Sequence, residues 1–519
     1  MRSVVVSQTY FDSVTLMKIS SVLTGLTGVR QAVAIMATEA NKQTVREAGL
    51  LVEGLDGLGA TDLLIAVEAD EEASAEAAIT RARELLKGEA PGSTPARRAA
   101  PRTLDSALGI LPGANLALIS VPGVYAAAEA ARALRRGLHA MVFSDNVTVE
   151  DELRLKILAR EKGLLLMGPD CGTAILNGVP LAFANAVRRG SIGIVGAAGT
   201  GIQQVSVLVE RLGSGVSQAI GTGGRDLSAR VGGITMLQGL AALEADEETR
   251  VIVLVSKPPA GETARAVLAA VRGCSKPVVV VFLGGDRRPI EEAGAYAATT
   301  LAEAARLAVV LDRGETVVRG DEGWDEEGEA VARREAERMA GVQRYLRGLY
   351  SGGTLCDEAM LILRELIGTV YSNVPLDPRL RLPDAWTGVA DTVVDLGDDQ
   401  FTRGRPHPMI DPALRVARLE REAADPEVAV VLLDVVLGYG AHPDPAGALA
   451  AAITRAKERA AAEGRYLSVV ASVCGTPADP QGLDEQEATL RSAGVILQPS
   501  NALAARMAGL ICRIARGRR

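Results

Sequence analysis

Apolar residues follow two alternating patterns along most of this chain. Short unbroken apolar runs are typical of buried strands, whereas apolar residues that recur every three or four positions are typical of amphipathic helices. The run Ser191–Val195 shows the first pattern, and Val205, Leu208, Val209 and Leu212 show the second directly after it. Because predicted strands and helices alternate in this way, the sequence indicates an α/β protein built on parallel sheets.

The same patterns predict most of the other regular elements. The predicted strands are Val4–Ser7, Gln31–Met36, Asp62–Val67, Leu116–Val121, Ala140–Ser144, Leu164–Met167, Val216–Gly221, Val251–Val255, Val278–Phe282, Thr392–Leu396, Val428–Val436 and Tyr466–Ser472. The predicted helices are Ser13–Leu23, Lys42–Ala48, Glu71–Leu86, Val124–Arg136, Glu150–Lys162 and Ala446–Ala462, besides the helix that begins near Ile202.

Changes in composition divide the chain into domains and linkers. We predict a small α/β domain, ferredoxin-like or half-Rossmann, over 1–88 and a Rossmann-like domain over 104–188. Flavodoxin-like domains follow over 189–315 and 343–519, and we interpret 189–315 and 428–519 as two copies of one unit. The Pro/Gly/Ala/Arg-rich segment 89–103 and the charged segment 316–342 are the predicted linkers.

A glycine turn directly after the run Ser191–Val195 suggests an anion site. Gly199, Thr200 and Gly201 lie between this strand and the next helix, where free backbone N–H groups and the helix dipole favour a phosphate. A second strand–turn–helix follows Val428–Val436, with Asp444 and Pro445 as helix-start residues and Gly438, Tyr439 and Gly440 in the turn. We predict that both turns hold one phosphate; the alternative is two turns kept for packing.

The overall composition excludes several classes of protein. The net charge of −8, with dispersed basic residues, argues against nucleic acid and an anionic membrane surface as partners. The five cysteines lack metal-ligand spacing and the chain has only three histidines, so we expect no metal site and reduced thiols in a cytoplasm. The sequence shows neither a signal peptide nor an apolar run long enough to span a membrane.

Three further segments follow predicted strands and belong at the ligand edge of a parallel sheet. They contain Asn146, Cys171 and Arg225, which we take as candidate substrate-binding residues. A small buried residue near a turn is the alternative for Cys171. Ser256–Glu262 follows another strand at the same edge.

Several of these motifs together resemble the succinyl-CoA synthetase superfamily. Gly168-Pro-Asp-Cys171 and Gly190–Thr200 are similar to the G-P-N-C and G-x-I-G-I-V-S-x-S-G-T motifs of its α subunit, and Leu437–Gly440 is similar to the F-G-G turn of its β subunit. The combination, with Phe401–Asp411, resembles the FdrA family over nearly the whole chain. The resemblance implies a CoA-binding-like domain over 104–188, ligase-type domains over 189–315 and 343–519, and no ATP-grasp domain.

Two departures from the superfamily bear on activity. Glu292 stands where the synthetases carry a phosphorylated histidine, and Val4–Tyr10 has no glycine where they bind the CoA phosphates. These departures argue against an ATP-driven phosphoryl relay and against CoA as a ligand. The two predicted turns are then interpreted as a binding site for inorganic phosphate or carbamoyl phosphate.

The resemblance implies carbamoyl transfer between oxalurate and phosphate, the oxamate carbamoyltransferase reaction of allantoin breakdown, together with partner subunits. For this reaction Arg403, Arg405 and His407 are candidate ligands of the substrate carboxylate, with solvated loop charges as the alternative. His442 is a candidate general acid and Glu292 a candidate base. The competing hypotheses are an acyl-CoA ligase of altered mechanism and a non-catalytic scaffold subunit. A homo-oligomer is compatible with each hypothesis.

Overall fold

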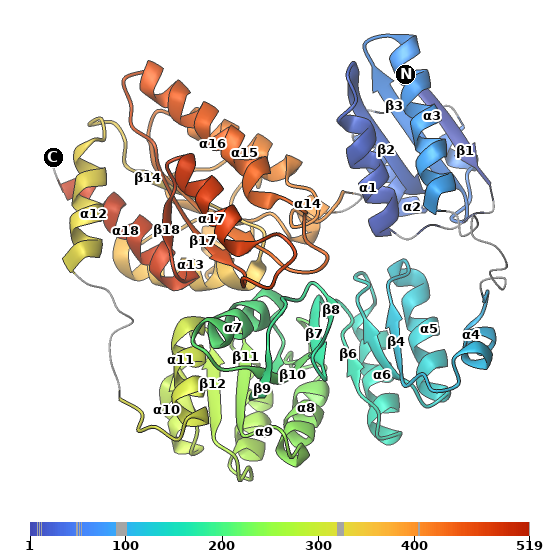
Figure 1. Ribbon diagram of the computed structural model, residues 1–519, viewed down its shortest axis with the longest axis vertical. Coiled ribbons are helices and arrows are strands. Elements are labelled where there is room, and N and C mark those ends of the chain that lie inside the picture. The colour runs from blue at the N-terminus through green and yellow to red at the C-terminus, as the bar shows by residue number, and fades with distance from the viewer. Residues whose placement is uncertain are drawn as a thin grey trace. The chain divides into compact units, whose positions relative to one another are not determined.

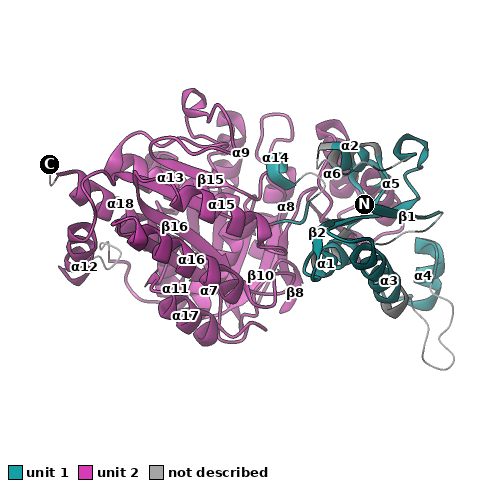
Figure 2. Cartoon of the chain, turned by 90° about the horizontal axis from the view of Figure 1, so that it is seen from above, with its two compact units in different colours: residues 1–115, 120–125, 399–407 teal, residues 116–119, 126–398, 408–519 magenta. Residues whose placement is uncertain are grey.

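The structure, a computed structural model, describes residues 1–7, 9, 11, 13–47, 50, 52, 54–89, 101–318, 326–402 and 405–517. The chain forms two compact units, coloured separately in Figure 2. Unit 1 comprises residues 1–115, 120–125 and 399–407, and unit 2 comprises residues 116–119, 126–398 and 408–519. The predicted α/β fold class with several parallel sheets is confirmed (Figure 1).

Unit 1 is organised on an antiparallel sheet in which β3 (Leu63–Ala69) lies between β1 (Arg2–Val6) and β2 (Val29–Met36). Antiparallel pairing is incompatible with the half-Rossmann alternative and is in keeping with the ferredoxin-like one. Residues 63–67 of β3 are fully buried because apolar residues pack on both faces of the sheet. The helices of unit 1 are α1 (Ser13–Thr24), α2 (Glu39–Glu47), η1 (Leu55–Gly57), α3 (Glu72–Glu89), α4 (Leu104–Ile110) and α14 (Asp399–Thr402).

The first sheet of unit 2 is short and parallel. Its strands β4 (Leu116–Ile119), β5 (His139–Val142) and β6 (Leu166–Met167) lie in chain order, connected by α5 (Gly123–Arg135) and α6 (Val149–Glu161). The next strands, β7 (Thr173–Leu176) and β8 (Val179–Ala182), form a hairpin that the apolar pattern does not predict. This hairpin joins the larger sheet that follows, through the antiparallel pairing of β7 with β10.

The larger sheet contains five parallel strands besides the hairpin. Its order is β13-β12-β11-β9-β10-β7-β8, so its parallel part has the flavodoxin-like order 2-1-3-4-5. The parallel strands are β9 (Arg189–Gly196), β10 (Val216–Gly221), β11 (Val251–Ser256), β12 (Val278–Phe282) and β13 (Tyr296–Ala298). The helices are α7 (Gly199–Arg211), α8 (Ile234–Ala245), α9 (Gly261–Val271), α10 (Arg287–Glu292) and α11 (Leu301–Asp312).

The last sheet of unit 2 has the same strand order, β15-β14-β16-β17-β18, and is entirely parallel. Its strands are β14 (Tyr345–Tyr350), β15 (Thr392–Asp395), β16 (Val428–Val436), β17 (Ser468–Cys474) and β18 (Ile496–Gln498). The helices in this part of the chain are α12 (Glu326–Glu337), α13 (Gly353–Ile367), η2 (Pro378–Leu380), α15 (Ala413–Ala423), α16 (Pro445–Ala462), α17 (Leu483–Ser492) and α18 (Asn501–Gly517).

The topology changes the interpretation of the repeat. In the order 2-1-3-4-5, β9 is the first strand of its sheet and β14 is the first strand of the other, whereas β16 is a third strand. The second copy therefore begins at β14 rather than at Val428, and the counterpart of the turn before α7 is the turn before α13. The sequence pattern paired β9 with β16 because a glycine turn and a helix follow each of these strands.

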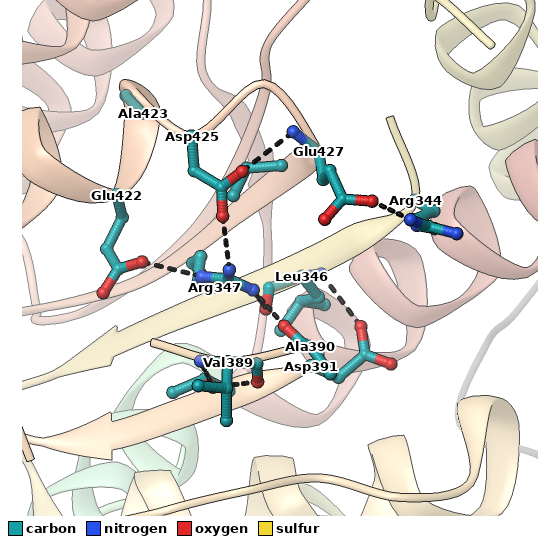
Figure 3. A network of polar contacts seen from close by, with 12 residues as sticks. Arg344, Leu346, Arg347, Val389, Ala390, Asp391, Glu422, Ala423, Asp425 and Glu427 are labelled. Carbon is teal, nitrogen blue, oxygen red and sulfur yellow. Dashed lines mark hydrogen bonds and ion pairs between the residues drawn. The ribbon is translucent and has the colours of Figure 1, made fainter. Parts of the chain in front are cut away.

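A buried ionic network holds the amino-terminal edge of this last sheet (Figure 3). Arg347 on β14 is 1% exposed and donates to Glu422 at 2.7 Å and to Asp425 at 2.8 Å. Nearby, Asp391 accepts a hydrogen bond from the backbone of Leu346. Because these acids directly precede strands or end a helix, the network lies opposite the carboxyl edge where ligands bind; its role is structural.

Candidate functional site

Two helix starts face each other at the carboxyl edges of the two flavodoxin-like sheets. A Cβ added at Gly201 in α7 would lie 3.0 Å from Thr354 Cγ2 in α13, and one added at Gly352 would lie 2.8 Å from Thr200 Cγ2. Glycine at both positions therefore permits the close approach of the two helices. The helix dipoles place two partial positive charges at one point.

The backbone at both helix starts is open to a ligand. Ala198 and Gly352 are the N-cap residues of α7 and α13, and neither supplies a side-chain cap to the helix. The N–H groups of the first three residues of α7, and of the first three residues of α13, have no hydrogen-bond acceptor among the described residues. Gly199, Thr200 and Gly353 are partly exposed, so these donors are accessible. Such a pair of uncapped helix starts suits a phosphate.

Asp434 on β16 fixes the turn before α13. Its carboxylate is fully buried and accepts hydrogen bonds from the backbone of Ser351 at 2.9 Å and of Gly352 at 2.8 Å, as well as from the Ser351 hydroxyl. The buried Arg415 guanidinium donates to the same carboxylate at 2.9 Å. Asp434 therefore binds the N–H groups of the two residues before α13. The N–H groups in the first turn of α13 stay available to a ligand.

A small group of charged residues lies next to these helix starts. Lys257, which follows β11, forms an ion pair at 2.5 Å with Asp357 of α13, and Asp395 ends β15. Burial raises the pKa of Asp357, and the neighbouring lysine offsets this only in part. Burial opposes the charge of Lys257, but Asp357 outweighs it and raises the pKa of the lysine. Acids with perturbed pKa values next to two helix starts are typical of a functional site.

The predicted second phosphate turn has two of its three N–H groups occupied by the protein. Gly438 donates to the side chain of Gln481 at 3.0 Å, and Tyr439 donates to the carbonyl of Ala184 at 2.8 Å. Gly440 lies against the ring of Phe183, where a Cβ would be 3.0 Å from Cδ1. This turn therefore packs against the first half of unit 2 and leaves fewer free N–H donors than the prediction requires.

The two predicted acid–base residues, His442 and Glu292, make local contacts within their own segments of the chain. The Nδ1 atom of His442 accepts a hydrogen bond from the backbone of Asp444 at 3.0 Å, at the start of α16. Glu292, at the end of α10, is exposed and forms an ion pair with Arg288 at 2.8 Å. No contact of either side chain with the α7 and α13 helix starts is found in the described residues. We therefore assign neither residue to a phosphate site at these helix starts.

Cys171, Asn146 and Arg225 lie around the carboxyl edge of the short sheet. The Cys171 thiol is buried, and burial raises its pKa to about 12, so it is a protonated core group rather than a surface ligand. Asn146 is exposed with a φ of 53°, a left-handed conformation often found near functional sites. Arg225 donates to the carbonyl of Val147 and pairs with the buried Glu152, which binds the two loops together.

The predicted carboxylate-binding loop belongs to unit 1. Arg405 and His407 lie in the segment 399–407 that clusters with this unit. Arg403 lies outside the described residues. The role of these three residues stays a prediction.

Sequence reasoning missed the turn Ser351–Thr354 and the acids Asp357, Asp395 and Asp434. The signal available was the pair Gly352-Gly353, which follows Tyr350 and Ser351, because glycines between a strand and a helix are also the mark of the first turn. Lys257 was within the segment Ser256–Glu262 that we assigned to the ligand edge. The described residues hold no cluster of His, Cys, Asp and Glu that could bind a metal ion. Among the helices of the described ranges, none has the length and apolarity to cross a membrane.

Three segments of the chain match known protein families. Residues 349–511 match the CoA-ligase family, 187–284 match the CoA binding domain, and 1–101 match the AllF heavy metal-associated domain. The CoA-binding match does not fall on 104–188, the segment for which we predicted a CoA-binding-like domain, and that assignment stays a prediction. Residues 1–101 contain neither cysteine nor histidine, the ligands that soft metals prefer.

Whole-chain similarity agrees with these matches. "Uncharacterized protein YahF" of Escherichia coli K12 is 48% identical over 96% of each chain. The succinate–CoA ligase subunit alpha 2 of Archaeoglobus fulgidus is 30% identical over 35% of this chain and 63% of its own length. The solved ATP citrate lyase of Methanothrix soehngenii, in complex with citrate and coenzyme A, is 13% identical with a TM-score of 0.37, over 79% of this chain and 84% of that chain; a score at this level carries no argument.

The two flavodoxin-like sheets with facing helix starts, together with these matches, define a chain of the succinyl-CoA synthetase superfamily, α-like in its first part and β-like in its last. Within that superfamily the chain belongs to the FdrA family.

Proposed function

We propose that this chain binds inorganic phosphate or carbamoyl phosphate between the starts of α7 and α13 and serves as a subunit of a carbamoyltransferase. The observation that carries the proposal is the pair of facing, uncapped helix starts. Backbone N–H groups held in this way stabilise charge on phosphate oxygens as it changes during transfer. The reaction moves a carbamoyl group between the nitrogen of oxalurate and a phosphate oxygen.

The chemistry of this transfer needs little besides positioning. Phosphate is itself the nucleophile: its oxygen bonds to the carbamoyl carbon, the C–N bond of oxalurate breaks, and the proton of hydrogen phosphate passes to the departing oxamate nitrogen. The protein therefore has to hold phosphate next to the carbamoyl carbon and to neutralise its charge. Lys257, next to the helix starts, supplies a cation for that purpose. The link of the FdrA family to oxamate carbamoyltransferase supports the choice of oxalurate as substrate and of separate partner subunits.

A second candidate is an acyl-CoA ligase of altered mechanism. It is favoured by the CoA-binding match over 187–284 and by the similarity to succinate–CoA ligase alpha subunits. It is disfavoured by Glu292 in place of the phosphorylated histidine. Each candidate predicts a different product, so one set of assays separates them.

The test uses the purified chain together with any subunits that co-purify with it. With oxalurate and phosphate, carbamoyl phosphate and oxamate should form and be detected by mass spectrometry. Gly352→Val should abolish this by forcing the helix starts apart, while Gly261→Val, at the open start of α9, is the matched control.

The ligase candidate is tested with the same preparation. Labelled ATP should leave no acid-labile phosphate on any of the three histidines, and CoA should bind no more tightly than about millimolar, equivalent to about −4 kcal/mol. Acyl-CoA formation from an acid, ATP and CoA, without any carbamoyl phosphate formation, would replace the proposed function with the ligase.

A further inference from the structure

Asp395 occupies a fixed position at the carboxyl end of β15. Its backbone is bracketed by Asn373, whose side chain accepts from Asp395 N and donates to Asp395 O, both at 3.0 Å. Asp395 is only 9% exposed, and its Oδ1 accepts a hydrogen bond from Gly397 at 2.9 Å. The other oxygen, Oδ2, has no hydrogen-bond donor among the described residues.

This second oxygen points to the start of α13. A Cβ added at Gly353, the first residue of that helix, would lie 2.7 Å from Asp395 Oδ2. Only a glycine therefore lets the carboxylate reach the helix start. Gly353 belongs to the pair of helix starts assigned to phosphate, so an acid and an anion site share one helix end.

The charged neighbours of Asp395 come from three elements. Lys257 after β11 favours the carboxylate form, while Asp357 of α13 and Asp398 in the following loop disfavour it. The Cys356 thiol, also on α13, is buried, and its own pKa is raised by burial and by Asp395. Burial is the largest effect on Asp395 and raises its pKa to about 7.

We propose that Asp395 is the proton-exchanging group of this site, so that a divalent oxyanion binds between α7 and α13 together with one proton on Asp395. The physical reason is that a dianion and a carboxylate would otherwise share the partial charge of one helix end and repel each other at close range. Protonated Asp395 removes that repulsion and lets its carboxyl group donate an O–H hydrogen bond to the bound oxyanion. The proposal rests on the proposed phosphate site and assigns its pH dependence.

The test measures binding of inorganic sulfate by calorimetry. Sulfate is a suitable probe because it carries the same charge as hydrogen phosphate but does not titrate near neutral pH. At about pH 7 the wild-type protein should take up about half a proton for each sulfate bound, seen as a dependence of the heat on the buffer. The affinity should fall about tenfold between about pH 6 and pH 8.

Asp395→Asn is the informative variant. The asparagine keeps an oxygen for the Gly397 N–H, so the strand end should stay folded, which circular dichroism checks. This variant should bind sulfate without proton uptake and with an affinity that does not change over the same pH range. Asp398→Asn, the matched control, removes the same charge from the adjoining loop and should keep both the proton uptake and the pH dependence, with the midpoint moved to lower pH because Asp398 raises the pKa of Asp395.

The outcomes separate the two proposals. Sulfate binding without proton uptake in the wild type would overturn the role of Asp395 and leave the phosphate site standing. Proton uptake that persists in Asp395→Asn would place the proton on another group, such as Asp357, and would also overturn it. If no sulfate binds at any pH, the proposed function fails as well.

Discussion

Two buried aspartates at the same sheet edge have different tasks because their partners differ. Asp434 accepts hydrogen bonds from Ser351 and Gly352 and is paired with Arg415. Among the described residues, Asp395 accepts a hydrogen bond only from the Gly397 N–H, on Oδ1, and its Oδ2 is directed at α13. A fully satisfied carboxylate holds structure in place, whereas a partly satisfied one is free to exchange a proton.

Replacing Asp434 by asparagine should strongly destabilise the protein. The change leaves the Arg415 guanidinium buried without its counter-charge, and breaking a buried pair in this way typically costs about 3–5 kcal/mol. Urea denaturation followed by circular dichroism measures the loss. The exposed pair of Arg455 with Glu420 provides the control, since Glu420→Gln should cost less than about 1 kcal/mol. Equal losses in the two variants would show that Arg415 finds another partner.

Asp395 should also leave a signature in the pH dependence of stability. Its pKa is about 7 in the folded protein, against about 4 in an unfolded chain. Between these values the folded state binds the proton more tightly, so the contribution of this group is present at low pH and is lost as the pH rises through 7. Relative to wild type, Asp395→Asn should therefore gain about 4 kcal/mol in free energy of unfolding from about pH 4 to pH 8. A pH-independent difference between the two proteins would contradict this.

At the scale of elements, the sequence predicts buried strands well where the apolar run is unbroken, as in β12. It misses β14, because Arg347 and Gly348 interrupt that run. Arg347 is tolerated inside the sheet only because Glu422 and Asp425, far along the chain, pair with it. No local pattern contains that information, and the same omission hid α13 as the second half of the candidate site.

The distance between the helix starts of α7 and α13 should control anion affinity. At Gly352 φ is −109°, which alanine adopts readily, so the only cost of Gly352→Ala is contact with Thr200. We expect sulfate affinity to fall about tenfold, corresponding to about 1.4 kcal/mol. Thr200→Ala in the same protein should restore part of it by removing the two nearest atoms, and Gly261→Ala at the open start of α9 should change nothing. Unchanged sulfate affinity in Gly352→Ala would exclude the starts of α7 and α13 as the binding site.

At the scale of the whole molecule, the two flavodoxin-like parts of unit 2 are joined by buried polar contacts. Asn185 donates to Asp479 at 2.8 Å and to the carbonyl of Leu437 at 3.0 Å, and Gln203 of α7 donates to Asn185. Thr476 also donates to the carbonyl of Ala186. Directional contacts of this kind specify one arrangement of the two sheets, which an apolar interface alone would leave less defined. Residues about 290 positions apart in the sequence meet here, so composition and local pattern could not predict the contact.

Arg211, the last residue of α7, should couple this arrangement to ligand binding. Its guanidinium donates to the carbonyls of Gly475, Val473 and Pro499 in the last sheet, at 2.9, 2.7 and 3.2 Å. Arg211→Met keeps the apolar stem but leaves those carbonyls unpaired, so we expect a loss of about 2–4 kcal/mol in the free energy of unfolding.

The same variant should also bind sulfate more weakly, since α7 carries one of the two helix starts and its far end would no longer be held. Differential scanning calorimetry and a sulfate titration measure the two effects on one preparation. The matched control is Arg189→Met, which removes an exposed ion pair with Glu248 and should cost less than about 1 kcal/mol without changing sulfate affinity. Loss of stability with unchanged sulfate affinity would show that the contacts of Arg211 join the two sheets without orienting α7.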